Sequence, residues 1–136
     1  MTQPQRNKLG AQEWIKKAEE DELSLKTVLV NGAPSTACFL AQQMAEKYLK
    51  GLLVFYGQSF PKIHDLKRIA TLLEPFVPDI FDLEGEFNNL NKFYAATRYP
   101  GDIPEGFGVE DAKLAFEAAL RVKEFSLKII YQESNA

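Results

Sequence analysis

A short stripe of charged residues interrupts an otherwise apolar stretch of the sequence: Glu46, Lys47 and Lys50. In a helix these side chains lie about one turn apart, so they can point together at a neighbour, a ligand or solvent. Two lysines beside one carboxylate could hold a phosphate group, with Glu46 orienting the cations. An ordinary solvated helix face with a Glu46–Lys50 pair would give the same pattern.

A second polar pair, His64 and Asp65, precedes a predicted helix. His64 is the only histidine of the chain. It could donate to a phosphate or a sugar, or act as an acid or base near neutral pH. Asp65 could orient a cation, and it could equally cap the free N–H groups at the start of the helix.

The third group surrounds Arg98, which lies between two tyrosines, Tyr94 and Tyr99. The arginine offers five donors and a flat face for phosphate binding or base stacking. Either tyrosine could stack on a base. Alternatively, Arg98 bonds the last carbonyls of the helix before it.

One further acid, Asp21, falls on the apolar face of a predicted helix that also carries Trp14 and Ala18. It could occupy an edge position with access to solvent. It could also turn inward and hold a base or a hydroxyl group, since a buried carboxylate must be paired.

Helical periodicity accounts for nearly the whole chain, and no segment shows the sustained alternation of a β-strand. Residues 1–10 are predicted to form a flexible N-terminal tail, 11–132 one helical domain and 133–136 a C-terminal tail. Capping residues, glycines and prolines delimit five predicted helices: 11–31, 34–56, 65–74, 80–97 and 109–132. The fold class is therefore all-α, an antiparallel up-and-down bundle of four to five helices.

The second of these helices is apolar nearly all round, with one stripe from Ala37 to Phe55 and another beside it from Cys38 to Leu53. Such a helix belongs in the middle of a bundle. We therefore expect it to be covered except along its charged stripe, and we expect that stripe to face the turn around Arg98.

Composition excludes several classes of function. The chain has 16 basic and 19 acidic residues, and this weakly acidic balance argues against a general nucleic-acid coat protein. One cysteine and one histidine cannot form the usual zinc or dimetal sites, so we expect no metal and no cofactor. Cys38 lies among apolar neighbours and is predicted to be a buried core residue. Since no apolar run could span a membrane and nothing indicates export, a cytoplasmic protein is expected.

The polar residues taken in order resemble the HEPN family, named for higher eukaryotes and prokaryotes nucleotide-binding. The resemblance covers roughly residues 11–132 and rests on an ordered set: Trp14–Ala18–Asp21, then Gln42, Gln43, Glu46, Lys47 and Lys50, then Pro61–His64–Asp65–Leu66, and last Arg98–Tyr99–Pro100. It implies a helical bundle that usually forms a homodimer. Many prokaryotic members act with a minimal nucleotidyltransferase partner in a toxin–antitoxin or nucleotide-handling pair.

Some members of the family are metal-independent ribonucleases, which carry an arginine followed after four to six residues by a histidine. Here that histidine would stand at Ile103, Pro104 or Glu105, so the motif is absent. No catalytic residue is therefore assigned. A divergent ribonuclease that uses His64 instead is one alternative, and a protein-interaction subunit without a ligand is another. In that second alternative, Phe107, Phe116 and Phe125 would contribute to the interface.

The sequence favours a non-catalytic module that binds a nucleotide or an RNA end. Phosphate would be held by Lys47, Lys50 and Arg98, and Tyr94 or Tyr99 would stack on a base. His64 would donate to phosphate or sugar, while Glu46, Asp65 and Asp21 would orient the cations.

Overall fold

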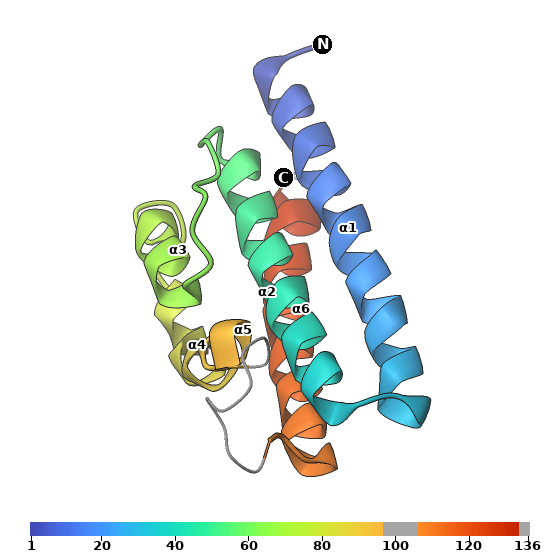
Figure 1. Cartoon of the computed structure of the whole chain (residues 1–136). Helices are drawn as coiled ribbons and strands as arrows, with labels where there is room; N and C mark the ends of the chain where they lie inside the picture. The colour runs from blue at the N-terminus through green and yellow to red at the C-terminus, as the bar shows by residue number, and fades with distance from the viewer. Residues whose placement is uncertain (97–105, 134–136) are drawn as a thin grey trace.

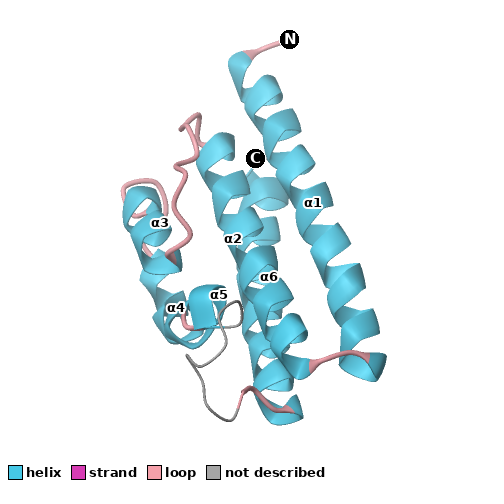
Figure 2. Ribbon diagram, in the orientation of Figure 1, coloured by secondary structure: helices cyan, strands magenta, loops and turns pink. Residues whose placement is uncertain are grey.

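The computed structural model describes residues 1–96 and 106–133, and every regular element in this part of the chain is a helix (Figure 2). Three helices are long: α1 (Gln3–Asn31), α2 (Pro34–Phe55) and α6 (Val109–Glu133). Between α2 and α6 lie four short ones: α3 (Leu66–Leu73), the 3-10 helix η1 (Ile80–Leu83), α4 (Glu84–Asn91) and α5 (Phe93–Ala96). The prediction of an all-α bundle is confirmed.

Helix α2 lies at the centre of the bundle (Figure 1). It contacts α1 and α6 over much of its length, and it also contacts α3, α4 and α5. Helices α1 and α2 are antiparallel, whereas α6 runs in the same direction as α2, because the short helices carry the chain back across the bundle (Figure 1). The ends of α2 and α6 therefore lie at the same end of the molecule.

Small residues let the long helices approach closely. Ala11, Ala18, Ala41 and Ala45 are fully buried between them. A Cβ atom added to Gly51 would lie 3.3 Å from the Cβ atom of Trp14 and would crowd α1 against α2. Larger buried side chains, among them Tyr48, Phe87 and Phe93, fill the rest of the core.

The N-terminus differs from the prediction of a flexible tail over residues 1–10, because α1 already begins at Gln3. Thr2 and Gln5 form a capping box: the Thr2 hydroxyl accepts a hydrogen bond from the Gln5 N–H at 3.2 Å, and Gln5 Oε1 accepts one from the Thr2 N–H at 2.7 Å. Pro4 fits the first turn, where its missing N–H has no helical partner to lose. These residues are typical of a helix start, but the polar composition of residues 1–10 led to the prediction of a tail.

The two ends of α2 are formed differently. At the start, Ser35 has a residue type suited to an N-cap, but the cap position is Ala33, without a side-chain hydrogen bond, and Pro34 opens the helix. At the other end Gly57 has φ +75°, the left-handed conformation that its place after the helix predicted.

The predicted helix from Ile80 to Thr97 is wrong as a single element, because the chain bends through η1, α4 and α5 instead. Gly85 and the asparagines Asn88, Asn89 and Asn91 are poor helix formers. Asn91 in addition uses its side chain to bond the start of α3, which fixes the end of α4 against that helix.

Candidate functional site

A buried carboxylate, Glu46, lies at the centre of the candidate site. It is 5% exposed, and three side chains approach it. Lys50 Nζ lies 3.0 Å from Oε2, Gln42 Nε2 donates to Oε1 at 3.2 Å, and His64 Nδ1 lies 3.1 Å from both oxygens. The charge is thus compensated by one ammonium group and two further donors, as burial requires.

Lys50 is not the uncovered cation that the sequence led us to expect. Its residue exposure is 6%, and it forms the predicted i,i+4 pair with Glu46 inside the bundle rather than on a solvated face. Its ammonium group lies 6.0 Å from the centre of the Trp14 ring, and that ring packs edge-on against Phe60. The expectation failed because helical periodicity does not reveal that α1 and the loop before α3 cover this stripe.

Lys47 forms an ion pair with an acid on α1. Its Nζ lies 2.5 Å from Asp21 Oδ2, and both side chains are mostly buried. Asp21 therefore turns inward to hold a base, the second of the two interpretations open from the sequence. Lys47 ties α1 to α2, and it is not oriented toward His64.

His64 is the most accessible member of the group, with 43% of its side chain exposed. Its ring stacks on Tyr94 with centroids 4.2 Å apart and planes 16° from parallel. Gln42 Nε2 also donates to the backbone carbonyl of His64 at 3.0 Å, so one amide braces the loop and the carboxylate together. Because Nδ1 faces a carboxylate, we assign the proton to Nδ1, which leaves Nε2 for other contacts.

Asp65 caps α3, as its position before the helix suggested. Its Oδ1 accepts hydrogen bonds from the N–H groups of Lys67 at 2.9 Å and Arg68 at 3.4 Å. The same oxygen accepts one from Asn91 Nδ2 at 2.9 Å, and Asn91 Oδ1 accepts one from the Leu66 N–H at 2.8 Å. Sequence reasoning missed Asn91; the one available signal was its place among residues unsuited to a helix interior.

These residues enclose a shallow pocket of about 200 Å³, lined by His64, Asp65, Asn91 and Tyr94. The structure thus brings together Glu46, Lys50, His64, Asp65 and Tyr94, and it places Lys47 and Asp21 in a separate ion pair. Arg98 and Tyr99, also predicted for the site, lie outside the described residues.

A second buried ion-pair group joins the two outer long helices. Glu22 on α1 accepts hydrogen bonds from Lys123 on α6 at 2.8 Å and from Lys26 at 3.0 Å. Burial alone would raise the pKa of Glu22, but the hydrogen bonds from Lys123 and Lys26 outweigh it and lower the pKa. This group is structural and lies apart from the pocket.

Cys38 is fully buried on α2, as predicted. Burial, together with the charge of Asp111, raises the pKa of its thiol to about 12. At neutral pH the thiolate is therefore essentially absent, and Cys38 is an inert core residue.

The fold and the site define a class: a small all-helical domain whose central helix carries a buried Glu–Lys–His group beside a polar pocket. Comparison with known families gives a match to the HEPN domain over residues 11–130, and the chain belongs to that family. Comparison with curated proteins gives no significant match.

Two solved structures share the fold and 30% sequence identity with the chain. The protein TT1696 from Thermus thermophilus has a TM-score of 0.80 over 87% of this chain and 96% of its own. The protein ST0689, described as an archaeal HEPN homologue, has a TM-score of 0.72 over 88% and 97%. Among the described residues, no helix combines the length and the apolar character needed to cross a membrane.

Proposed function

We propose that this chain is a non-catalytic HEPN module that binds a nucleotide or an RNA end at the His64 pocket. The observation that carries the proposal is the pairing of a half-exposed histidine with a buried carboxylate. Glu46 holds Nδ1 of His64 while the ring remains 43% exposed at a polar pocket. A histidine held in this way is oriented for recognition with little entropy left to lose.

The ligand groups follow from the lining of the pocket. In its protonated state His64 presents Nε2–H, a suitable hydrogen-bond donor for phosphate. The nearby Asn91 amide can form hydrogen bonds with a base or a ribose. Arg98 follows Tyr94 by a few residues and remains our proposed second phosphate contact. Tyr94 already stacks on His64, so we propose Tyr99 as the residue that stacks on a base.

The roles of the lysines change with the geometry. Lys50 neutralises Glu46 inside the bundle and Lys47 neutralises Asp21, so neither is offered as a direct phosphate contact. Both act as positioning residues for the helix that supports His64.

Calorimetry with ATP, UTP and a short 5′-phosphorylated RNA tests the proposal. We expect His64→Gln to weaken binding roughly tenfold, the loss of one charge-assisted hydrogen bond, and Arg98→Ala to weaken it further. Lys62→Gln removes an exposed charge from the same loop and is the matched control. Equal weakening in Lys62→Gln, or no binding of any ligand by the wild type, would contradict a specific pocket.

The same RNA samples, analysed for cleavage products, test the ribonuclease alternative, because His64 held by Glu46 also has the geometry of an acid–base group. Cleavage by the wild type that disappears in His64→Ala would replace the binding proposal with a catalytic one.

A second proposal is that the module forms a homodimer and pairs with a minimal nucleotidyltransferase through α1. Three exposed apolar residues, Leu9, Leu23 and Val30, are 50%, 70% and 77% exposed and fall at multiples of seven positions, so they share one face of α1. Phe107, Phe116 and Phe125, the aromatics expected at an interface, instead pack partly buried against the core.

Sedimentation of the chain alone and with a nucleotidyltransferase encoded beside it tests this second proposal. We expect Leu23→Glu to dissociate the assembly, whereas Glu20→Gln, an exposed change on the same helix, leaves it intact. A monomer that ignores the neighbouring gene product would rule out the pairing.

A further inference from the structure

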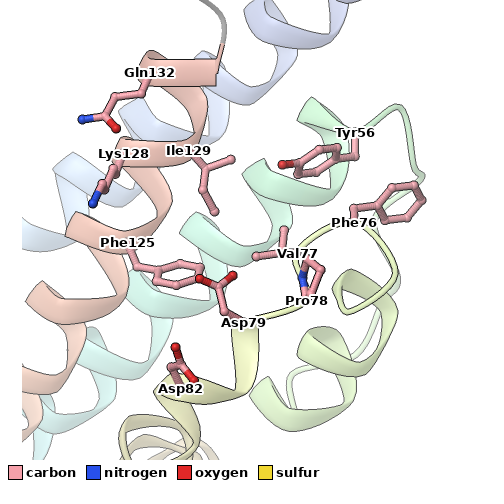
Figure 3. A pocket seen from close by; sticks show the side chains of 10 residues that line it. All are labelled: Tyr56, Phe76, Val77, Pro78, Asp79, Asp82, Phe125, Lys128, Ile129 and Gln132. Carbon is pink, nitrogen blue, oxygen red and sulfur yellow. The ribbon is translucent and has the colours of Figure 1, made fainter. Parts of the chain in front are cut away.

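A larger cavity lies at the end of the bundle where α2 and α6 both terminate (Figure 3). Its volume is about 450 Å³, and the turn between α3 and η1 closes one side. Among the residues that the structure describes, it shares no lining residue with the His64 pocket. A cavity of this size is within the range of small-molecule sites.

One part of the cavity wall is apolar and aromatic. Val77 is 3% exposed, and Phe125 and Ile129 contribute from α6. The Tyr56 ring at the end of α2 stacks on Phe76, with centroids 5.3 Å apart and planes 21° from parallel. The facing sides of these two rings cover each other, so a flat apolar group could lie against an outer ring face on this side and against Phe125 and Ile129 on the other.

The charged groups lie on opposite sides. Asp79 and Asp82 line the side formed by η1 and the turn before it, and the Asp79 carboxylate points into the cavity on the side of Phe125 (Figure 3). Lys128 lies across from them on α6 and extends away from the Tyr56 and Phe76 rings (Figure 3). Neither aspartate forms a salt bridge with another residue of the described ranges 1–96 and 106–133.

We propose that this cavity binds a small organic cation, an ammonium group carried on a flat apolar body. Two carboxylates and the negative faces of aromatic rings both attract a positive group, and the aromatic and aliphatic walls bind the body. The site is independent of the nucleotide-binding proposal, since none of its residues belongs to the His64 group.

Lys128 allows the charge of the ligand to be tested. A cation in the cavity is repelled by the Lys128 ammonium group, so Lys128→Gln tightens its binding. An anion would be attracted by Lys128, and the same substitution would weaken its binding. The direction of one substitution therefore separates the two ligand classes.

The proposal is tested by titrating three probes of similar shape into the full chain and monitoring each titration by two-dimensional NMR. The probes are 2-phenylethylammonium, 2-phenylethanol and phenylacetate. We expect the ammonium probe to shift the signals of Val77 and Ile129 and to bind most tightly, the alcohol more weakly and phenylacetate least. Equal affinities, a preference for phenylacetate, or no shift by the ammonium probe up to roughly 10 mM, beyond the weak end of ordinary affinities, would overturn it.

Three exposed variants complete the experiment. We expect Asp79→Asn to weaken binding of the ammonium probe roughly tenfold and Lys128→Gln to tighten it roughly threefold. Glu20→Gln, which removes an exposed charge on α1, is the control and leaves the affinity unchanged. A weaker affinity in Lys128→Gln, or an equal loss in Asp79→Asn and Glu20→Gln, contradicts the assignment.

Discussion

His64 Nδ1 lies 3.1 Å from both carboxylate oxygens of Glu46, although the two residues are 18 positions apart and belong to different elements. The same carboxylate holds Lys50 at 3.0 Å on the buried side. Glu46 thus links the interior of the bundle to the pocket.

Replacing Glu46 by Gln leaves Lys50 buried with no counter-charge. We expect a loss of about 3 kcal/mol in the free energy of unfolding, measured with urea, because an unpaired buried cation is strongly unfavourable. The double variant Glu46→Gln/Lys50→Met removes both charges and should recover most of that loss. If Glu46→Gln stays within about 0.5 kcal/mol of the wild type, an ordinary surface substitution effect, the ion pair is not a buried one in solution.

Asp65→Ala removes the cap of α3 and the acceptor for Asn91. We expect a loss of about 1–2 kcal/mol in thermal or urea unfolding, the usual effect of deleting an N-cap. Asp65→Asn keeps a capping oxygen and is the matched control, expected to lose less. Equal losses in both variants would mean that the charge of Asp65, rather than its capping geometry, stabilises the helix.

The Lys47–Asp21 pair joins α1 to α2 near the surface, with the two side chains 23% and 16% exposed. We expect Asp21→Asn to lower the free energy of unfolding by about 1 kcal/mol at low ionic strength, and by somewhat less at about 1 M salt, which partly screens the remaining exposed portion of the pair. The comparison of unfolding curves at the two salt concentrations checks this. A loss that is unchanged by salt would show that packing, not charge, carries the effect.

Glu22 makes the stability depend on pH in the acid range. The folded-state pKa of Glu22 is lowered from its ordinary value of 4.5, so its ion pairs contribute above that value and are lost as pH falls through the folded-state pKa. We therefore expect the stability difference between the wild type and Glu22→Gln, seen at neutral pH, to shrink as pH is lowered below 4.5.

Unfolding curves at neutral and acid pH measure that difference, and Glu20→Gln serves as the control at an exposed position of the same helix. A difference that stays constant across the acid range would contradict the assigned ion pairs with Lys123 and Lys26.

Cys38 should react slowly with thiol reagents in the native state, because the thiol is buried and its pKa is raised to about 12. We expect labelling by an alkylating reagent at neutral pH to require unfolding, and to become rapid in urea above the unfolding transition. Rapid native-state labelling would mean that the start of α2 opens locally.

The sequence alone determined the helical fold class, the central position of α2 and the burial of Cys38, and it offered capping as one of two roles for Asp65. These features depend on apolar periodicity and on short-range turn and cap chemistry, which the order of residues records directly. Two helix boundaries were predicted wrongly because the local signals were weak or were overlooked. One signal was the capping box at Thr2, within a polar segment, and the other was the group of asparagines that interrupts the predicted helix before Phe93.

Only the tertiary structure decided which charges are free and which are paired. The sequence placed Glu46, Lys47 and Lys50 on one stripe, but it could not show that His64 and Lys50 meet at Glu46 while Lys47 turns to Asp21. The pockets were likewise hidden, since Asn91, Tyr56 and Lys128 reach them from distant parts of the chain. The physical reason is that desolvation and pairing depend on distances across the bundle, and these follow from the packing of helices rather than from the spacing within any one of them.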